Sequence, residues 1–430
     1  MNSPLKCHLE KLECHFTWDL GCYKHKLQEL WDNFQDMDQQ TCTWQVHYNN
    51  LLGYIQHALG SNEEALMYLH KAASVIQEQG TEEAGARLQV NKANLAWVHF
   101  LLGNTAESKA YLEEVEKLQQ MHPAPSGCTL HPEVSGEKGW TLVKFDLSKK
   151  QQSIDFFRMA LKAEPERKEW HKGLARAMSK PLLMSEFTTD EVLEQLKRAK
   201  ELDPDSLFLQ SLYWQKRSEV QAENYDKEVQ SLLQKTIDTG KMEGLSVILK
   251  YFKNISMDKA IQEGERVREK FPTSTKVLRN VANLYKWKVY SMNEDSREKQ
   301  ALVEKSIELF EEVVRHYPHN LKVKLALASM YQNKNNIERA NEIYKELLSE
   351  EDDLPPHRRQ RLYYSYACYL FHSRQSKDSI LFYMKAAEIP DNRGCRLKCI
   401  KVLQKTLKRG RDPHCEDIFC LLQRIQQEKI

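Results

Sequence analysis

A small residue, an aromatic or aliphatic residue one helical turn later and a closing proline recur along this chain. Pro165, Pro204, Pro272 and Pro318 each close such a pattern. The step from Pro204 to Pro272 spans two units of about 34 residues, the length of two short helices and their turns. A single helix pair cannot bury its apolar face alone, so successive pairs must stack. This spacing predicts an array of helix pairs.

Eight segments fit the pattern of a tetratricopeptide unit, in which short side chains let two helices approach closely and proline stops the second helix. The small residues that define these segments include Ala65, Ala72, Ala96, Ser108, Ser153, Ala160, Ala199, Ala260, Ser306, Ala328, Ala340, Ala367 and Ala386. The double step before Pro272 also predicts a degenerate unit at about 206–240. We therefore predict an all-α, tetratricopeptide-repeat superhelical solenoid with about eight helix-pair repeats.

Three segments interrupt the array. Residues 122–138 are rich in Pro, Gly and Ser and are predicted to be a linker, residues 181–190 break the periodicity, and residues 291–300 are a polar insertion. These breaks predict an N-terminal subdomain at 1–125, a middle subdomain at 135–290 and a C-terminal subdomain at 300–430 that ends in basic helices.

Charge, hydropathy and cysteine content indicate where the protein resides but not what it binds. The 63 Lys and Arg residues nearly balance 61 Asp and Glu residues, which neither favours nor excludes nucleic acid. No apolar run approaches the roughly 20 residues that span a bilayer, and the N-terminus has no signal-peptide core. Ten cysteines scattered among helices indicate reduced thiols. We expect a cytoplasmic protein with no membrane partner.

Five segments together resemble one family along nearly the whole chain. They are LECHFTW at 12–18, NLLGYIQHALGSNEEAL at 50–66, NLAWVHFLLGNTAESKAYL at 94–112, EKGWTLVKF at 137–145 and FPTS at 271–274. In this order they resemble the interferon-induced proteins with tetratricopeptide repeats. The resemblance implies an innate-immune antiviral effector with no enzymatic activity and no cofactor. It would bind single-stranded viral RNA by a 5′-triphosphate or an incompletely methylated cap in a basic tunnel and block its translation.

Trp140 and Lys144 are the first candidates for that site. They lie four residues apart, which would put them on one face of a helix. The resemblance implies that Lys144 contacts the terminal phosphates and that Trp140 stacks on a cap base. A tryptophan that closes the repeat core and a solvated surface lysine are the alternatives.

The resemblance also places Lys180, Lys253, Arg279, Asn280 and Lys286 among the RNA contacts. Lysine stands at 180 and 253 where the family has arginine. A lysine binds phosphate as a point charge and lacks the bidentate fork of arginine, so these positions would specify phosphate geometry less tightly.

A row of lysines near the C-terminus is a further candidate. Lys398, Lys401, Lys405 and Lys408 recur at helical spacing and would form one basic stripe, suited to a phosphate backbone. A solvated helix face is the alternative for this stripe.

Some positions depart from the family. Ser246 and Val247 stand where the family has an Arg-Tyr pair that contacts the first nucleotides. This departure favours the alternative function, a protein-interaction scaffold in antiviral signalling whose partners would be other family members or signalling proteins.

Family members usually continue for another repeat beyond the position of Ile430, which leaves C-terminal capping and self-association open. The segment 27–43 is diverged, and its nearby polar candidates are Gln35, Asp36, Gln39 and Gln40.

Catalytic and metal sites find little support in the sequence. There is no P-loop, G-x-S-x-G or H-E-x-x-H motif. Cys395, Cys399, His414, Cys415 and Cys420 lack the spacing of a zinc knuckle, and cysteines four apart on an amphipathic helix usually pack in the core. We therefore expect no metal ion.

Overall fold

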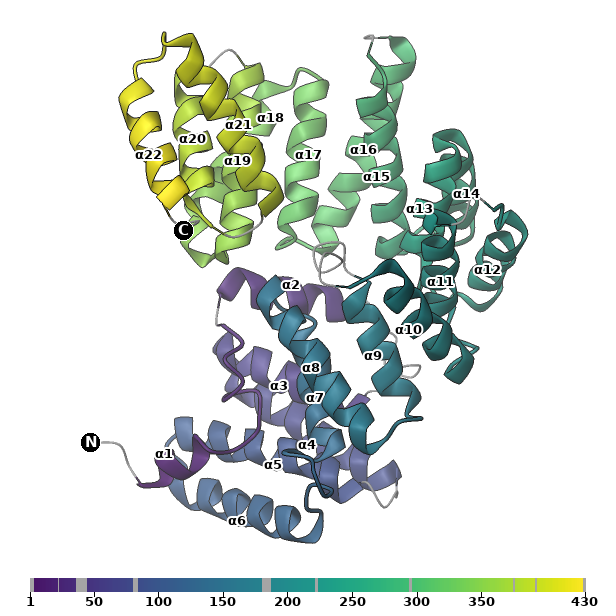
Figure 1. Cartoon of the computed structure of the whole chain (residues 1–430), viewed down its shortest axis with the longest axis vertical. Coiled ribbons are helices and arrows are strands. Elements are labelled where there is room, and N and C mark those ends of the chain that lie inside the picture. The colour runs from purple at the N-terminus through teal and green to yellow at the C-terminus, as the bar shows by residue number, and fades with distance from the viewer. Residues whose placement is uncertain are drawn as a thin grey trace. The chain divides into compact units, whose positions relative to one another are not determined.

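A computed structural model describes residues 4–21, 23–35, 45–79, 84–179, 187–220, 223–293, 296–373, 376–390 and 393–427. Within these ranges every regular element is a helix (Figure 1). The chain divides into two compact units, which we call unit 1 (Met1–Cys22 and Asn33–Glu263) and unit 2 (Tyr23–Asp32 and Gly264–Ile430).

Unit 1 contains α1 (Pro4–Leu9), α3 (Gln45–Ala58), α4 (Asn62–Gln79), α5 (Ala84–Leu101), α6 (Thr105–Met121), α7 (Pro132–Leu142), α8 (Leu147–Ala163), α9 (Lys168–Met178), α10 (Thr189–Leu202), α11 (Leu207–Val220), α12 (Asp226–Thr239) and α13 (Leu245–Ile255). The helices α2 (Lys24–Gln35) and α14 (Met257–Lys270) cross the boundary between the units.

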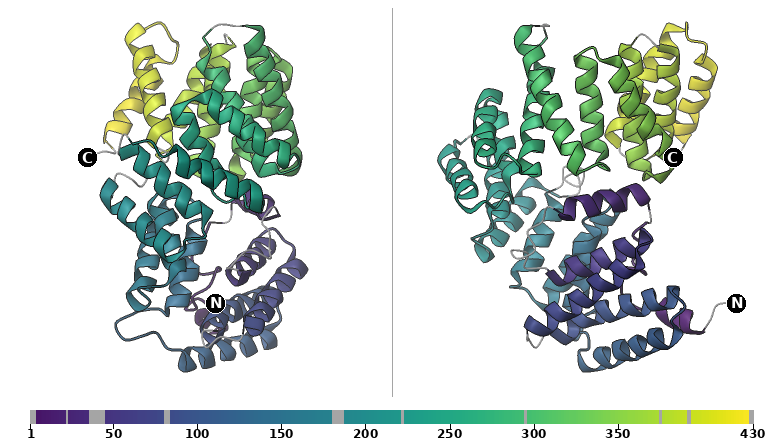
Figure 2. Two further views of the ribbon diagram at one scale, coloured as in Figure 1. Left: turned by 90° about the vertical axis from the view of Figure 1, so that its right-hand side faces the viewer. Right: turned by 180° about the vertical axis from the view of Figure 1, so that it is seen from behind.

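Unit 2 contains α15 (Thr275–Ser291), α16 (Arg297–His316), α17 (Leu321–Asn333), α18 (Ile337–Ser349), the 3-10 helix η1 (Glu351–Asp353), α19 (Pro356–His372), α20 (Ser376–Glu388), α21 (Arg393–Arg409) and α22 (Cys415–Gln427). The pairs α15–α16, α17–α18 and α19–α20 stand side by side within this unit (Figure 1 and Figure 2).

The small residues of the repeat are the points at which the two helices of a pair meet. A buried serine at the start of the second helix donates a hydrogen bond to the carbonyl of the small residue in the first. Ser108 Oγ reaches the Ala96 carbonyl at 2.8 Å, and Ser379 Oγ reaches the Ala367 carbonyl at 3.0 Å. Larger side chains would hold the helices too far apart for this bond, so these positions stay small.

The spacing argument also locates the least regular repeat. The degenerate unit predicted at about 206–240 is the pair α11 and α12, which starts at Leu207 and ends at Thr239. The predicted all-α repeat architecture is thus confirmed by the helices. Within the polar insertion predicted at 291–300, α15 ends at Ser291 and α16 begins at Arg297. The division into three subdomains stays a prediction.

The predicted linker at 122–138 is wrong in its second half. Helix α7 begins at Pro132, and the His131 side chain accepts a hydrogen bond from the Glu133 amide at 3.2 Å to cap it. Glu133, Ser135 and Glu137 are buried, although their polar character suggests a surface loop. The burial of Glu133 and Glu137 is explained by ion pairs and hydrogen bonds to distant parts of unit 1.

Hydrophobic residues fill the space between the helices of both units. In unit 1, Phe157 and Trp170 are fully buried at the contact between α7, α8 and α9. In unit 2, Tyr383, Cys399 and Ile418 belong to the core between α19 and α22. Among the described helices, none is both long enough and apolar enough to cross a membrane.

Candidate nucleic-acid interface

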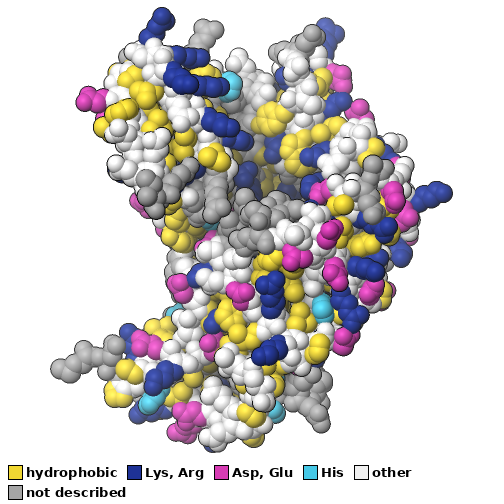
Figure 3. All heavy atoms as spheres, viewed as in Figure 1, with side chains coloured by type: hydrophobic (Ala, Val, Ile, Leu, Met, Phe, Trp, Pro, Cys, Tyr) yellow, Lys and Arg dark blue, Asp and Glu magenta, His cyan; other side chains and the backbone are white. Residues whose placement is uncertain are grey.

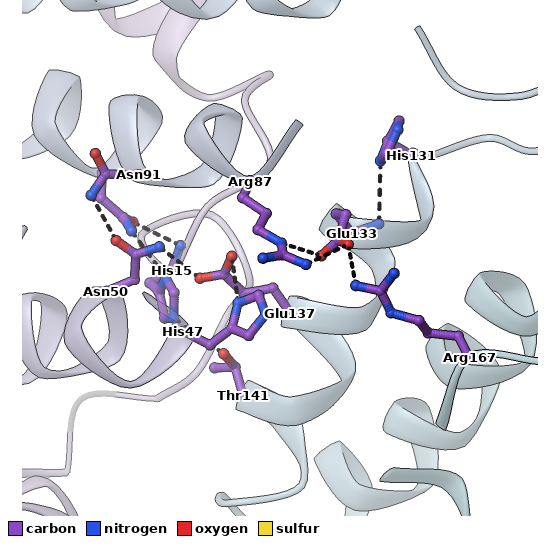
Figure 4. A network of polar contacts seen from close by, with 11 residues as sticks. His15, His47, Asn50, Arg87, Asn91, His131, Glu133, Glu137, Thr141 and Arg167 are labelled. Carbon is purple, nitrogen blue, oxygen red and sulfur yellow. Dashed lines mark hydrogen bonds and ion pairs between the residues drawn. The ribbon is translucent and has the colours of Figure 1, made fainter. Parts of the chain in front are cut away.

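A buried polar network fixes the position of α7 in unit 1 (Figure 4). Glu137 is fully buried, and its carboxylate lies 2.8 Å from His47 Nδ1 and accepts a hydrogen bond from Asn50 Nδ2 at 2.9 Å. Asn91 Nδ2 donates to Asn50 Oδ1 at 2.8 Å and so joins α5 to α3. Burial raises the pKa of Glu137, but His47, His15 and Asn50 outweigh it and hold that pKa below its usual value. Glu137 is therefore a carboxylate inside the protein, stabilised by its partners.

His15 ties the other side of α7 to the N-terminal segment. Its backbone N–H donates to Asn94 Oδ1 at 3.1 Å, which turns the Asn94 amide nitrogen toward His15 Nδ1, also 3.1 Å away. Nδ1 thus accepts, and Nε2 carries the hydrogen that it donates to Thr141 Oγ1 at 3.1 Å. Burial lowers the pKa of His15 to about 4.

Two arginines hold the first turn of α7 through Glu133. Arg87 Nε lies 3.1 Å from Glu133 Oε2, and an Arg167 guanidinium nitrogen lies 3.0 Å from Oε1. Burial raises the pKa of Glu133, and the two guanidinium groups oppose that shift. Helix α7 is therefore held by polar contacts along its length, and the residues at its C-terminal end sit on a rigid support.

Trp140 and Lys144 lie at that end. The Trp140 ring packs edge-to-face against Phe157 with centroids 5.5 Å apart and is half-buried at the rim of the unit 1 core. The Lys144 ammonium lies 5.8 Å from the centroid of the Phe34 ring. Helix α7 ends at Leu142, so Lys144 follows in the closing turn, and the premise of one continuous helix through both residues is wrong. They are nevertheless neighbours in one short segment.

The other unit 1 candidates are less closely grouped. Lys253 is half-buried in the last turn of α13. Ser246 is exposed and Val247 half-buried in the first turn of the same helix, whose Tyr251 and Phe252 face the core. Lys180 lies outside the described residues, as do Asp36, Gln39, Gln40 and the side chain of Gln35.

Arg279, Asn280 and Lys286 all lie on α15 of unit 2. The Arg279 guanidinium is 5.9 Å from the centroid of the Tyr317 ring. Asn280 Nδ2 donates to the Lys276 carbonyl at 2.8 Å, so its amide is engaged on its own helix. Lys286 Nζ donates to Asn283 Oδ1 at 2.8 Å. Burial, followed by the nearby Arg361 guanidinium, lowers the pKa of Lys286 to about 8.

The predicted basic stripe lies on α21, and a further helix, α22, follows it in unit 2. Lys398, Lys401, Lys405 and Lys408 are all exposed, and Lys398 Nζ is 5.8 Å from the centroid of the Tyr364 ring. Lys and Arg side chains gather over this helix in Figure 3. The four lysines therefore present their charge to solvent. This exposure is compatible both with a wall that binds an RNA backbone and with a solvated helix face.

Two cations near Arg279 and Lys286 were missed at the level of sequence. Lys322 on α17 and Arg361 on α19 interact electrostatically with each other, and Arg361 interacts with Lys286. A signal for them exists. Each stands six residues before the small residue of its helix, Ala328 and Ala367, so the two occupy the same position of the repeat.

The cysteine-rich C-terminal segment has a structural role. Cys399 is buried in the unit 2 core, and Cys395, one turn earlier on α21, is half-buried. Across the described ranges, no three His, Cys, Asp or Glu side chains gather into a group that could hold a metal ion.

Comparisons with known proteins cover nearly the whole chain. Residues 92–120 match the tetratricopeptide repeat family. The antiviral innate immune response effector IFIT1 of Macaca fascicularis is 27% identical, over 94% of this chain and 87% of the relative. The human interferon-induced protein with tetratricopeptide repeats 2 is 25% identical, over 99% of this chain and 93% of the relative. The resemblance to the interferon-induced tetratricopeptide-repeat family is confirmed.

Solved structures of this family agree with the fold of the chain. A monomeric mutant of IFIT1 with m7Gppp-AAAA has a TM-score of 0.68 and is 26% identical, over 95% of this chain and 92% of that one. The human IFIT1 dimer with PPP-AAAA has a TM-score of 0.66 and is 25% identical, over 94% and 90% of the two chains. The likeness to the interferon-induced tetratricopeptide-repeat proteins thus extends from sequence to structure.

Proposed function

We propose that this chain is a cytoplasmic antiviral protein that binds single-stranded viral RNA by its 5′ end in a basic tunnel and blocks its translation. The end that it holds is a 5′-triphosphate or an incompletely methylated cap. The observation that supports this proposal is the likeness, over nine-tenths of the chain, to IFIT1 structures that contain PPP-AAAA and m7Gppp-AAAA. The role needs binding and exclusion of other factors from the RNA end, and no catalytic step.

The end of α7 supplies the chemistry that such an end requires. A triphosphate concentrates negative charge, which the ammonium of Lys144 would attract. A cap or first base presents a flat ring, for which the half-buried Trp140 offers an aromatic partner. The network of Glu133, Glu137 and His15 keeps both groups in place before RNA arrives, so little ordering is needed on binding.

The remaining candidates would contact the RNA beyond its end. We assign this role to Lys180, Lys253, Arg279, Asn280 and Lys286, and to Lys401, Lys405 and Lys408 of the stripe on α21. Cations spread over several helices suit a phosphate backbone, which repeats its charge at every nucleotide.

The first test compares RNAs that differ only at the 5′ end. For Lys144→Glu we expect affinity for 5′-triphosphate RNA to fall at least tenfold, because a charge-assisted contact worth roughly 1.5–3 kcal/mol is lost and a repulsion is added. Binding of 5′-hydroxyl RNA should change little. Filter binding at fixed salt measures both affinities.

Lys109→Glu is the matched control, since Lys109 is an exposed lysine on α6 and undergoes the same charge reversal. It should leave both affinities unchanged. If the unaltered protein bound triphosphate, monophosphate and hydroxyl RNAs equally well, selection of the 5′ end would be wrong.

The exposed Ser246 favours a second function, a protein-interaction scaffold in antiviral signalling. At this position the chain offers neither charge nor aromatic surface to a nucleotide. A scaffold would capture partner proteins from infected cells even after nuclease treatment and with the Lys144→Glu substitution. Loss of all partners under either condition would contradict this second function.

A further inference from the structure

Exposed aromatic side chains gather at one end of the first helices of unit 2. Trp287 and Tyr290 lie in the last two turns of α15, and Phe371 lies in the last turn of α19. These residues are 37%, 53% and 54% exposed. Single exposed hydrophobic residues are common, but a group of large ones marks an interaction surface. We call Trp287, Tyr290 and Phe371 the aromatic patch.

Helix α17 connects the two sides of the aromatic patch, since it contacts both α15 and α19. The Tyr290 hydroxyl shares a hydrogen bond with Ser329 Oγ on α17. One turn further on, Gln332 Nε2 donates to the Tyr369 carbonyl of α19 at 3.5 Å. Tyr290 also interacts electrostatically with Cys368, which lies one turn before the α19 ring of the patch on the same helix face. The last turns of the three helices thus form one continuous surface.

The helices that carry the aromatic patch contain no carboxylate of their own. Asp and Glu are absent from the sequences of α15, α17, α19 and α21, whereas each of the second helices α16, α18, α20 and α22 contains acidic residues. Carboxylates that reach the first helices from elsewhere are paired, as Glu29 is with Arg358 and Glu304 is with Lys334 at 3.2 Å. Figure 3 shows hydrophobic side chains beside Lys and Arg in the hollow between α21 and the pair α15–α16. A ligand that complements this surface combines apolar groups with negative charge.

The rings suit apolar side chains of a peptide better than stacked bases. Nucleic acid that stacks on aromatic rings also needs cations beside them for its phosphates. The Lys286 ammonium lies 5.9 Å from the centroid of the Trp287 ring, but it donates to Asn283 Oδ1, back along α15, at 2.8 Å. Within the described ranges, no Lys or Arg side chain lies over the other two rings of the aromatic patch. Two of its three rings therefore offer apolar surface alone.

The polar groups and the size of the surface also fit an extended peptide. Asn333 ends α17, the helix between the rings, and its Nδ2 donates to the Ser329 carbonyl at 2.8 Å. In the part of the chain that the structure describes, no donor reaches Asn333 Oδ1, so this oxygen can accept a hydrogen bond from a peptide N–H. Packed helices lie about 8–10 Å apart, so three successive last turns span roughly 20 Å, the length of about six residues of extended chain.

We propose that Trp287, Tyr290 and Phe371 form a docking site for an extended acidic peptide segment of a partner protein, with an aromatic or large aliphatic side chain of the peptide packed among the three rings. The first helices, which contain no acidic residue, attract the carboxylates on either side of that anchor. The class of partner rests on the second function proposed above, the protein-interaction scaffold. The new element is the place and the chemistry of the docking site.

Tyr290→Ala with Phe371→Ala tests the site in the full chain, because both residues are half exposed and their truncation changes the surface more than the core. The probe is a phage-displayed library of random linear peptides selected on the unaltered protein. We expect enrichment of peptides that combine Asp or Glu with Phe, Tyr, Trp or Leu. Fluorescence polarisation then measures the affinity of the enriched peptides in synthetic form. It should fall at least tenfold in the double variant and should decrease as salt rises.

The matched control is Leu381→Ala with Phe419→Ala, at residues of similar exposure, 40% and 49%, on the second helices α20 and α22. It should leave the peptide affinity unchanged, and both double variants should melt at the temperature of the unaltered protein. Peptides that bind the test variant as tightly as the unaltered protein would overturn the site. The same holds if no peptide is enriched, or if the enriched peptides lack acidic residues.

A charge at a single position gives a second test that does not depend on the double variant. Phe371→Glu and Phe371→Lys both remove the ring and differ only in charge. Phe371→Glu should weaken the binding of acidic peptides more than Phe371→Lys does, because it adds repulsion to the lost contact. Equal effects of the two substitutions would contradict the acidic character of the peptide.

The outcome is separable from those of both proposed functions. The Tyr290 and Phe371 double variant should bind single-stranded 5′-hydroxyl RNA as the unaltered protein does, and a loss of RNA affinity with unchanged peptide affinity would make the aromatic patch an RNA surface instead. If the double variant still captured the nuclease-resistant partners from infected cells, the scaffold would stand and this docking site would be wrong. If no partner survived nuclease while the selected peptides still required the rings, the docking site would stand and the scaffold in antiviral signalling would be wrong.

Discussion

At the scale of single residues, His15 shows how packing selects one protonation state. Its Nδ1 faces the amide nitrogen of Asn94, and its Nε2 faces the Thr141 hydroxyl. A proton on Nδ1 would place two donors opposite each other in a buried site. The neutral ring is therefore the form that fits, in agreement with a pKa lowered by burial to about 4.

This preference predicts a loss of stability in mild acid. The unfolded chain binds the His15 proton near pH 6.5, whereas the folded chain resists it down to about 4. Stability from this residue is thus complete above pH 6.5 and decreases as the pH falls toward 4, by about 2 kcal/mol at pH 5. Urea unfolding at pH 7 and pH 5 measures it.

His15→Gln should be less stable at pH 7 but should lose less stability between pH 7 and pH 5 than the unaltered protein. His8→Gln, at an exposed histidine, should keep the full acid dependence. Equal acid dependence in all three proteins would show that His15 is not the titrating group.

Single residues also mark the limit of what the sequence reveals about the site. Trp140 and Lys144 could be chosen because a motif contains both. Lys322 and Arg361 resemble any charged residue on a helix, and only the stacking of repeats brings Arg361 near Lys286 and near Lys322. The sequence signal that they share is their position in the repeat, since each precedes the small alanine of its helix by six residues.

At the scale of elements, the contact between α7 and α9 depends on a glycine. A Cβ atom on Gly136 would lie 1.8 Å from Cζ3 of the fully buried Trp170. Trp170 cannot retreat easily, because its ring belongs to the unit 1 core and its Nε1 donates to Glu164 at 2.7 Å. The glycine thus sets the distance between the two helices.

Gly136→Ala should therefore destabilise unit 1 by about 1–3 kcal/mol, the usual cost of overpacking. Alanine favours helices over glycine by about 1 kcal/mol, so propensity alone predicts the opposite sign. Gly394→Ala on α21, at an exposed position, serves as the control and should leave the melting temperature unchanged or slightly higher. A stabilised Gly136 variant would mean that Trp170 has room to move.

Elements differ in how far sequence predicts them. The pair α11–α12 was located by spacing, because neighbouring repeats leave room for one helix pair there. The predicted linker at 122–138 overlaps the first residues of α7, because the segment HPEVSGEK at 131–138 is polar and contains glycine. Its start signal, a proline at the first helical position after His131, was present. The partners of Glu133 and Glu137 lie far away in sequence, so local patterns could not indicate their burial.

At the scale of the whole molecule, 63 basic and 61 acidic residues nearly balance, but the two kinds of charge are not evenly distributed. Unit 2 gathers positive charge at Lys322, Arg361 and the stripe on α21, while acidic residues elsewhere offset it. The periodicity of the sequence predicts the fold class. It does not predict which cations meet, since that depends on how repeats stack.

The repeat architecture also predicts that damage stays local. Ile418 on α22 is fully buried in a core that it shares with Cys399, Leu403 and Leu421. Ile418→Ala should cost about 2–4 kcal/mol, the range for truncating a buried aliphatic side chain. Because each helix pair is stabilised by its neighbours, hydrogen exchange should accelerate in α19–α22 and keep its rate around Phe157 and Trp170 in unit 1.

The control is Phe419→Ala, at the residue next to Ile418. Because Phe419 is 49% exposed, this substitution should change exchange in neither region. Faster exchange throughout both units would mean instead that the chain unfolds as a single cooperative body, and the independence of neighbouring repeats would have to be abandoned.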